Sequence, residues 1–567
     1  MKTAPQFPIL WLTLALAVAA SAWPSTAAAA GDRPQPRSVP GELSLSDGSN
    51  WAFVGGTWRQ GADGIIMPPA QVAEEYLAFA TTKAYGDFEA EFEFRHDAVF
   101  TDAAFLFRAQ DARHYYLVHF PCTGQQYRAK HFWAAISKID GSGWVKVLKM
   151  DLVPGVPSEI GLWHKARLVV KGKEIRLWVD GRPFAAAQDE SDTKPGCVGL
   201  ASYATQGPGK HSSFRRIQIK GEAMAARPWD KTIEPRRNWF VVHPTGGTGC
   251  SNITRAPNGD LLVLTWSGEL VRSRDNGRTW TSQGKLPQDL KEGLLHTSRD
   301  GRLHLHVIET TPPFTMRLGT SEDNGKTWSE PKAIGRVLFP ESVKVANVYG
   351  QALLELQDGT LLRLAYSTAP GDTSTIKNGR HYRLVHDGAF NFCMRSTDGG
   401  QSWSAPVNID GANPRPQSWT IAMEASEVSA AQTRDGKVMA LTRPFTSPWM
   451  WETWSSDGGK SWAPAARGSF AMYASTSSMV STASGALLIG GRHPGMAVQA
   501  SFDDGMTWQC YRIDTTAWAN GAMYQVKPDL VLYIYGGHFS PNPQLRAQFL
   551  RVTRHGLEPV AREAVGR

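Results

Sequence analysis

One eight-residue phrase occurs five times in this chain. Each copy reads Ser-x-Asp-x-Gly-x-(Thr/Ser)-Trp, and the copies span residues 273–280, 321–328, 396–403, 455–462 and 501–508. Repeats spaced by roughly 45 to 75 residues are typical of folds in which one supersecondary unit is used several times. The chain is therefore expected to adopt a repeat architecture over at least residues 273–508.

The residue types of this octet predict a hairpin corner. Its aspartate can accept hydrogen bonds from turn amides, and its glycine supplies a positive φ. Its final tryptophan is large and apolar, so we expect each ring to pack between neighbouring sheets. The five aspartates are Asp275, Asp323, Asp398, Asp457 and Asp503.

The octets resemble the Asp-boxes of the sialidase superfamily, whose fold is a six-bladed β-propeller. Six segments in which a turn precedes a strand support the resemblance, and an octet follows each of the first five. They are 258–266, 300–308, 358–366, 435–443, 484–491 and 528–535. We therefore expect an all-β fold with a six-bladed propeller over 239–556, closed by residues 239–243. In that family the boxes lie on the rim, far from the active site, so they indicate the fold and not the chemistry.

Residues 41–221 carry no octet and alternate apolar with polar residues at period two, as in 87–95 and 166–184. The segments DFEAEFEF, WHKARLVV and LWVDGRP resemble the concanavalin-like jelly rolls found beside secreted glycosidases. A concanavalin-like β-sandwich is therefore expected before the propeller, either carbohydrate-binding or a structural spacer. Residues 222–238 are polar, contain Pro228 and Pro235, and are interpreted as a linker.

The N-terminal residues have the pattern of a secretory signal. Lys2 precedes an apolar stretch from Ile9 to Ala20, and small residues follow up to Ala30. That apolar stretch is shorter than a membrane span. We expect residues 1–30 to be a signal peptide, the protein to be exported to the periplasm or released, and the mature chain to have no membrane span.

Charge and metal-ligating residues exclude some classes of partner. The formal net charge is +8, but the basic residues are dispersed, which argues against nucleic acid and is compatible with anionic glycans.

Five scattered cysteines form no zinc motif, and a bridge between Cys122 and Cys197 is the alternative to isolated thiols. His304 and His306 share one face of a predicted strand and could bind a metal, but the pattern supplies no third ligand. We therefore expect no metal and no cofactor, and the oligomeric state stays open.

Residues 427–443 carry the strongest resemblance to a sialidase site. In that family one blade has a glutamate, then an Asp-Gly turn, then an arginine about sixteen positions after the glutamate. Glu427, Asp435 and Arg443 have this spacing. The resemblance implies that Glu427 is the active-site glutamate and Arg443 one of three substrate-binding arginines. Arg492, eleven residues before the last box aspartate, is similar to another; a structural ion pair between Glu427 and Arg443 is the alternative.

Other family positions are not matched. Gly249 stands where the first-blade arginine is expected, and the loop before the first box is reduced to WSGEL, with only Glu269 as an acid. Gly521 stands where the nucleophilic tyrosine is expected, and Tyr524, three residues later, is kept as a catalytic candidate. These differences predict that the protein is not an ordinary sialidase.

Hydrolysis of a glycosidic bond by acid–base chemistry needs two carboxyl groups. With Glu427 as one, Asp372 and Asp387 are preferred as the second because they lie in the long insertion at 367–388, and such loops commonly bind ligands. Further alternatives are Glu269, Glu309 and Glu424. Trp449 and Trp451 follow Pro448 in a predicted loop and are candidate sugar-stacking platforms, with inter-blade packing as the alternative.

The leading functional hypothesis is an exported glycoside hydrolase of the sialidase superfamily that removes a terminal sugar from a glycan or polysaccharide. The second is a non-catalytic carbohydrate-binding protein that uses Glu427 and Arg443 for recognition. The third is a polysaccharide lyase in which Tyr524 or His381 abstracts a proton.

Overall fold

The computed structural model describes residues 42–45, 48–69, 75–99, 101–122, 132–153, 155–157, 159–204, 211–245, 249–290, 293–368, 375–377, 380–382, 390–409, 425–444, 449–492, 495–517, 519–537 and 544–566. The expected signal peptide (1–30), Asp372, Asp387 and Glu424 lie outside these residues. No helix within the described part of the chain has the length and apolar character needed to cross a membrane. The regular structure described is strand, apart from the short 3-10 helices η1 (Gly48–Asn50), η2 (Gln288–Leu290) and η4 (Arg562–Ala564).

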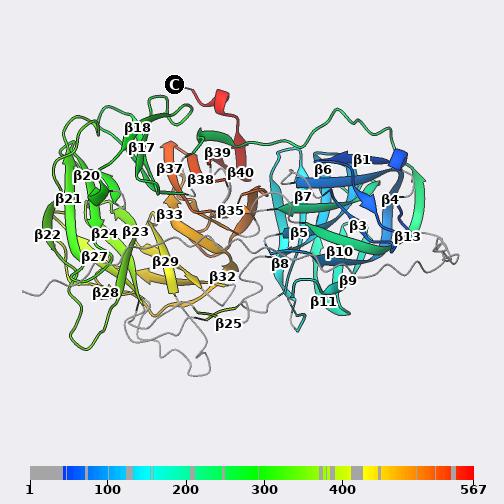
Figure 1. The fold of residues 1–567 in the computed structure, drawn as a ribbon, viewed down its shortest axis with the longest axis horizontal. Coiled ribbons are helices and arrows are strands. Elements are labelled where there is room, and N and C mark those ends of the chain that lie inside the picture. Colours follow the sequence, from blue (N-terminus) through cyan, green and yellow to red (C-terminus); the bar gives the residue numbers. More distant parts are fainter. Residues whose placement is uncertain are drawn as a thin grey trace, which may run out of the picture. The chain divides into compact units, whose positions relative to one another are not determined.

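The N-terminal domain is a β-sandwich of jelly-roll type (Figure 1). Its strands are β1 (Trp51–Val54), β2 (Arg59–Gln60), β3 (Ile66–Met67), β4 (Glu75–His96), β5 (Thr101–Asp111), β6 (His114–Cys122), β7 (Phe132–Asp140), β8 (Val145–Val153), β9 (Trp163–Lys171), β10 (Glu174–Val179), β11 (Arg182–Gln188), β12 (Gly196–Ala204) and β13 (Ser212–Ala225).

Strand β4 joins the two layers of the sandwich. Its first part pairs with β1 and β12, and its second part pairs with β9 and β13. Along this second part, apolar residues from Phe88 to Phe94 are buried while the acidic residues between them are half-buried, which confirms the period-two pattern. Phe94 stacks on Phe120 with a centroid separation of 4.0 Å in the apolar core between the layers.

Most of the second half of the chain forms a propeller-like ring of antiparallel sheets. The inner strands are β15 (Cys250–Arg255), β19 (Leu294–Thr297), β23 (Asn347–Glu355), β29 (Ala425–Gln432), β33 (Tyr473–Ser481) and β37 (Gly521–Lys527). Each contacts the next, and β37 contacts β15, so the ring is closed.

The remaining strands lie outside these inner strands. They are β14 (Phe240–His243), β16 (Leu261–Thr265), β17 (Glu269–Ser273), β18 (Thr281–Lys285), β20 (Leu303–Ile308), β21 (Thr315–Ser321), β22 (Lys332–Arg336), β24 (Leu361–Thr368), β27 (Asn391–Ser396), β28 (Val407–Asn408), β30 (Val438–Pro444), β31 (Trp449–Ser455), β32 (Ala466–Ala471), β34 (Leu487–Arg492), β35 (Met496–Ser501), β36 (Gln509–Asp514), β38 (Leu530–Gly536), β39 (Leu545–Thr553) and β40 (Gly556–Val560). A small hairpin, β25 (Thr375–Lys377) and β26 (Arg380–Tyr382), belongs to the insertion at 367–388.

The ring has five separate propeller sheets, where six blades were predicted. The other four-stranded meander, β33–β36, is not a sheet of its own because β36 also pairs with β8 of the sandwich. A buried charge cluster accompanies this pairing. Arg512 on β36 is 2.8 Å from the carboxylate of Asp102 and 2.9 Å from His119, and none of the three side chains is exposed. Residues Gly41–Arg567 accordingly form one compact unit.

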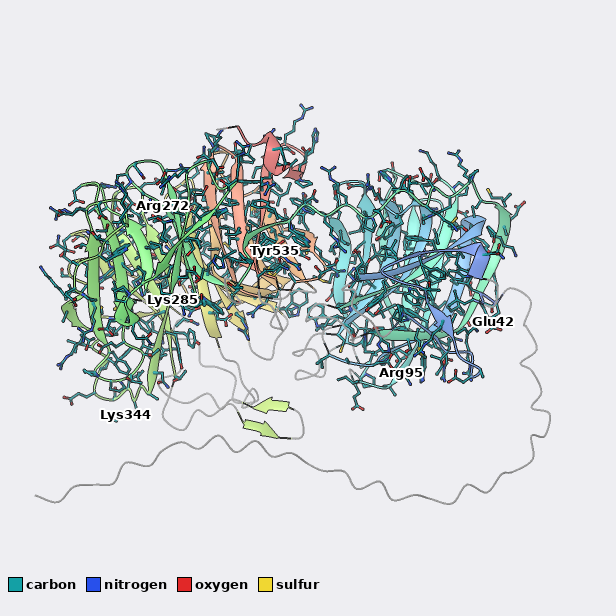
Figure 2. All side chains as sticks on the ribbon, turned by 45° about the horizontal axis from the view of Figure 1, so that its top comes forward. Glu42, Arg95, Arg272, Lys285, Lys344 and Tyr535 are labelled. Atoms are coloured by element: carbon teal, nitrogen blue, oxygen red, sulfur yellow. The ribbon has the colours of Figure 1, made fainter. Side chains whose placement is uncertain are left out.

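The predicted closure by residues 239–243 is confirmed. Strand β14 pairs antiparallel with β39, with Phe240 opposite Ala547, so an early strand completes the last sheet. Between consecutive units the ring contains six apolar clusters. The octet tryptophans pack against five of them, as predicted: Trp280, Trp328, Trp403, Trp462 and Trp508. Of the propeller residues labelled in Figure 2, Lys285 and Lys344 have exposed side chains, whereas Tyr535 on β38 is fully buried.

Each octet forms the predicted turn through its aspartate. In the fourth octet, Asp457 accepts hydrogen bonds from the backbone amides of Lys460 (3.0 Å) and Ser461 (2.9 Å) and from the hydroxyl of Ser461 (2.5 Å). Burial tends to raise the pKa of Asp457, but these bonds outweigh it and lower the pKa to about 2. The following glycine, Gly459, has a φ of 84°, which explains the glycine at this position.

We predict that Asp457→Ala lowers the free energy of unfolding by about 0.5–2 kcal/mol, the range measured for lost side-chain caps of helices. Urea denaturation followed by tryptophan fluorescence measures the change. Lys460→Ala is the matched control, because this exposed side chain belongs to the same turn and should change stability by less than about 0.5 kcal/mol. Equal stability of Asp457→Ala and the parent protein would show that the turn does not depend on this aspartate.

Candidate functional site

The two ends of the ring are chemically different. Each inner strand leads into a tight turn, and these turns lie beside the octets: the amide of Asn258 donates to the side-chain oxygen of Asn324 in the second octet (3.1 Å). The beginnings of the inner strands therefore lie at the opposite end of the ring, which we call the funnel end. The second strand of each unit runs antiparallel to the inner strand, so its last residues also reach the funnel end.

Glu427, Arg443 and Arg492 form an ion-pair cluster at the funnel end. Glu427 lies near the beginning of β29, and the arginines lie at the ends of β30 and β34. An Nη1 of Arg443 is 2.5 Å from Oε1 of Glu427, and an Nη2 of Arg492 is 3.0 Å from Oε2. The three side chains are only 9–17% exposed. The structure thus brings the three residues together, although Glu427 and Arg492 are 65 positions apart in the sequence.

A β-bulge directs Glu427 toward both arginines. The pairing of β29 with β30 shifts between Ser426 and Val428, and Glu427, the extra residue, has a φ of 49°. Bulges re-aim side chains and are enriched beside active sites, and a non-glycine residue at positive φ costs about 1–3 kcal/mol unless the surroundings hold it. The two ion pairs hold this conformation.

The electrostatics of the cluster favour an ionised Glu427. Burial raises the pKa of a carboxyl group, but the charges of Arg443 and Arg492 outweigh burial and lower the pKa of Glu427 below its ordinary value. Ionised Glu427 is thus paired with two guanidinium groups. Guanidinium groups bind carboxylates and hydroxyl groups by charge-assisted hydrogen bonds.

Tyr524 is not part of this cluster. Tyr524 pairs with Leu532, close to the turn of the hairpin between β37 and β38. Ser426, next to Glu427, pairs with Arg443, which is far from the turn of the hairpin between β29 and β30. Tyr524 therefore lies nearer the turn of its hairpin than Glu427 does. Its ring lies 5.8 Å from the guanidinium of Arg255. Arg255 in turn donates to Asn276 of the first octet, so Tyr524 lies toward the octet end.

The other predicted acids are separate from the cluster or outside the described residues. Glu269 lies 3.2 Å from Nε2 of His243, and Glu309 pairs with Arg317 at 2.8 Å. Asp372 and Asp387 belong to the part of the insertion that the structure does not describe, so their candidacy stays a prediction.

Trp449 and Trp451 lie on β31, where the sequence analysis placed a loop. Both side chains are half-buried, and the guanidinium of Arg467 covers the ring of Trp449 at 4.0 Å. The predicted loop is a strand because side chains alternate along β31: Met450, between the two tryptophans, is fully buried in an apolar cluster and anchors this segment. The two rings are therefore strand residues, one of which already has a cationic stacking partner.

The structure adds a cavity that sequence reasoning missed. It has a volume of about 370 Å³ and is lined at the funnel end by residues from three consecutive units, among them Ser251, Trp266, Tyr349 and Gln351. Trp266 is 40% exposed, which is unusual for so large an apolar ring. Its place as the last residue of the predicted segment 258–266 was the available signal, because side chains at strand ends reach the mouth of a ring.

Two family models match the chain. A BNR repeat-like domain matches residues 289–524, and a 3-keto-alpha-glucoside-1,2-lyase-like domain matches residues 41–220. No curated protein matches the sequence.

Solved structures similar to this chain include two sialidases and a carbohydrate-binding module. The Hadza microbial sialidase Hz136 has 13% identity and a TM-score of 0.43, with 84% of this chain and 96% of that chain covered. The NanB sialidase from Streptococcus pneumoniae has 12% identity and a TM-score of 0.40, with coverages of 82% and 95%. The module CBM66 from Bacillus subtilis has 18% identity and a TM-score of 0.25, with coverages of 30% and 96%. At these values the likenesses carry no argument about activity.

The chain is thus an all-β protein in which a propeller built on Asp-box turns follows a jelly-roll sandwich. More specifically, its propeller contains a BNR repeat-like domain over residues 289–524, and its sandwich matches the 3-keto-alpha-glucoside-1,2-lyase-like domain over residues 41–220.

We predict that Glu427→Gln lowers the free energy of unfolding at neutral pH by about 1.5–3 kcal/mol, the value of a hydrogen bond to a charged group. The lowered pKa of Glu427 gives the sign of the pH dependence. The stability that ionised Glu427 supplies is fully present above its unfolded pKa, about 4.3, and is lost as the pH falls through its folded pKa. The difference between the parent protein and the variant should therefore shrink at acidic pH.

Urea denaturation at a series of pH values measures this difference. Glu309→Gln is the matched control, because Glu309 also pairs with an arginine but both side chains are 34% exposed. Its effect should stay below about 1 kcal/mol. A Glu427→Gln effect no larger than that of Glu309→Gln would contradict the buried ion-pair cluster.

Proposed function

We propose that the protein is an exported glycoside hydrolase that releases a terminal sugar, distinct from an ordinary sialidase, at the funnel end of its propeller. The observation that carries the proposal is the buried cluster in which Glu427 holds Arg443 and Arg492 beside one another. Two guanidinium groups fixed in this way can bind a carboxylate or neighbouring hydroxyls of a sugar by charge-assisted hydrogen bonds.

The cavity at the same end of the ring suits a sugar ring. Sugars combine apolar ring faces with hydroxyl groups, so they bind where an exposed aromatic ring lies beside polar side chains. Trp266 supplies the aromatic ring, and Ser251 and Gln351 supply hydroxyl and amide groups. The BNR repeat-like and 3-keto-alpha-glucoside-1,2-lyase-like domains support a carbohydrate ligand for the protein as a whole.

In this proposal Glu427 positions the arginines and does not transfer the proton. A carboxyl group whose pKa lies below the ordinary value is ionised at neutral pH and is a poor general acid. The acid must then come from another residue, and Asp372 and Asp387 in the 367–388 insertion are the proposed source. Glu427 thus remains in the proposed site, but as the residue that positions the arginines and not as the proton donor.

A non-catalytic carbohydrate-binding protein is the second candidate. It is favoured by the position of Tyr524, which lies near Arg255 and the octet end of the ring. It is also favoured by the saturation of Glu427, whose two carboxylate oxygens both contact arginines.

A panel of glycans and aryl glycosides, including sialosides and uronides, separates these candidates. Release of a free monosaccharide indicates hydrolysis, whereas saturable binding without product supports the binding protein. Formation of an ultraviolet-absorbing double bond would point to a lyase. Absence of both binding and product over the whole panel would contradict the proposal.

We predict that Arg443→Ala weakens binding of the ligand found in this panel by about 10- to 100-fold, because a hydrogen bond to a charged group contributes about 1.5–3 kcal/mol. Calorimetry, or KM for a hydrolysed substrate, measures the change. Arg317→Ala is the control, since Arg317 also pairs with a glutamate but is not part of the funnel-end cluster. Unchanged binding in Arg443→Ala would place the ligand elsewhere.

We further predict that sialosides are poor ligands compared with another terminal sugar in the panel. Gly249 stands where the sialidase family has an arginine, so one charged contact to the sialic acid carboxylate is missing. The loss is expected to reduce kcat/KM by about 10- to 100-fold relative to the preferred sugar. Efficient and selective release of sialic acid would refute this expectation.

A further inference from the structure

Strands β19 and β20 place three histidines on one face of their sheet. His296 on β19 lies directly opposite His304 on β20 in the antiparallel register. His306 is two residues beyond His304 and therefore points to the same face. His296 is therefore the third histidine beside His304 and His306, and it comes near them only when β19 and β20 pair.

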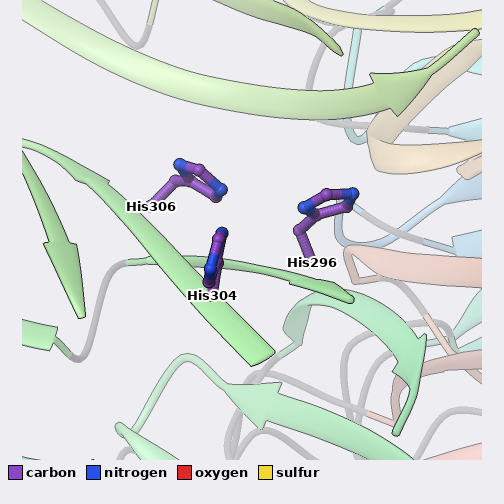
Figure 3. A group of neighbouring side chains, drawn as sticks. All are labelled: His296, His304 and His306. Carbon is purple, nitrogen blue, oxygen red and sulfur yellow. The ribbon is translucent and has the colours of Figure 1, made fainter. Parts of the chain in front are cut away.

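The three imidazole rings surround a common space (Figure 3). The ring centroids are separated by 6.2 Å (His296–His304), 5.9 Å (His296–His306) and 5.8 Å (His304–His306). One nitrogen from each ring can be chosen so that all three lie within 4.8 Å of one another. Tetrahedral zinc with Zn–N bonds of about 2.1 Å needs nitrogens about 3.4 Å apart, so modest side-chain rotation brings the ligands into range.

The hydrogen bonding of the cluster leaves suitable nitrogens available. Nε2 of His296 lies 3.0 Å from Oε2 of Glu355, while its Nδ1 is buried and has no hydrogen-bond partner among the described residues. Nδ1 of His304 and both nitrogens of His306 are likewise buried without such a partner. A carboxylate that accepts the second N–H of a histidine is the usual outer partner of a metal ligand, because it fixes the tautomer and the ring orientation.

Packing against the third octet orients His306. The ring of Trp403 in the third octet packs edge-on against His306 at 5.8 Å. Gly400 of that octet leaves the necessary space, since a Cβ there would lie 2.2 Å from His306.

A cavity gives access to the cluster from the octet end of the ring. Its volume is about 350 Å³, and His296 and His304 line it together with Glu355, Asp300, Asp398 and Arg299. Arg299 pairs with the carboxylate of Glu355 at 3.0 Å. The buried guanidinium of Arg363 donates a hydrogen bond to the carbonyl oxygen of His306 (3.1 Å). The cavity also leaves room for water as a fourth ligand.

We propose that His296, His304 and His306 form a binding site for one divalent transition-metal ion of the zinc class, oriented by Glu355. Three histidines and a water molecule are a known coordination set for zinc, and imidazole also suits copper and nickel. Because Glu355 belongs to β23 of the next unit, the ion would fasten two neighbouring units at the octet end. The site lies away from the funnel end, so it does not depend on the proposed carbohydrate activity.

The test uses the full chain, purified without a histidine tag, stripped with a chelator and titrated with Zn²⁺ alone. We expect one ion per chain by elemental analysis and a rise in Tm of several degrees at saturating zinc, because binding to the folded state stabilises it. The parent protein loaded with Co²⁺ should show the visible absorption of a tetrahedral site with nitrogen ligands. This spectrum requires no variant, so it tests the site even if a substitution impairs folding.

Variants assign the ligands. His304→Ala and His306→Ala should lose the zinc-dependent rise in Tm, and Glu355→Gln should weaken zinc binding by about 10- to 100-fold as an orienting residue. His243→Ala is the matched control, because His243 also contacts a glutamate but belongs to no cluster of three metal-ligating side chains among the described residues, and it should bind zinc like the parent protein. Failure of the parent protein to bind Zn²⁺ and Co²⁺, or unchanged binding in both histidine variants, would overturn the proposal.

Discussion

Burial of the two apolar faces of each four-stranded unit determines the architecture of the propeller. A twisted antiparallel sheet with apolar residues on both faces cannot cover them within the unit, so each face must pack on a neighbour. The six apolar clusters lie between consecutive units, and the inner strands contact one another around the whole ring. Closure of the ring leaves no unit with an uncovered face. The octet turns add to this packing, because each positions a tryptophan at such a cluster.

The same packing explains why the site lies where it does. Residues in the middle of the strands mostly form the clusters, so the side chains proposed to bind ligands lie at the strand ends or open toward them. Glu427, Arg443 and Arg492 lie at one end, and the histidine cluster opens toward the other. Glu427 adopts a positive φ at a bulge, which a regular strand residue would avoid. The ionic contacts of its carboxylate supply the compensating interaction.

Features encoded by neighbouring residues were predictable from the sequence. The octet turns follow from five residue types in a fixed order, and the pairing of Glu427 with Arg443 follows from one hairpin of known length. Features set by pairing between distant strands were not predictable. Tyr524 is only three residues from the position where the sialidase family has its nucleophilic tyrosine. It pairs with Leu532 close to the turn of its hairpin, however, and this places it nearer the octet end. His296 becomes a neighbour of His304 only through the register of β19 and β20, and the count of separate sheets changes because β36 pairs with β8.

Closure by β14 has a consequence for how the chain folds. This strand lies at Phe240–His243, but its partner residues in β39 begin at Leu545. The chain between them must be synthesised and largely arranged before the pairing can form, and such high contact order slows folding because the loop-closure entropy is lost before the contact is gained. Ring closure is therefore expected to be a late step. Until then residues 545–547 of β39 stay unpaired, whereas β40 already pairs with residues 549–553 on the same edge. An open edge is a site for association with other chains. The strand that completes the ring thus also covers the part of this edge that β40 leaves open.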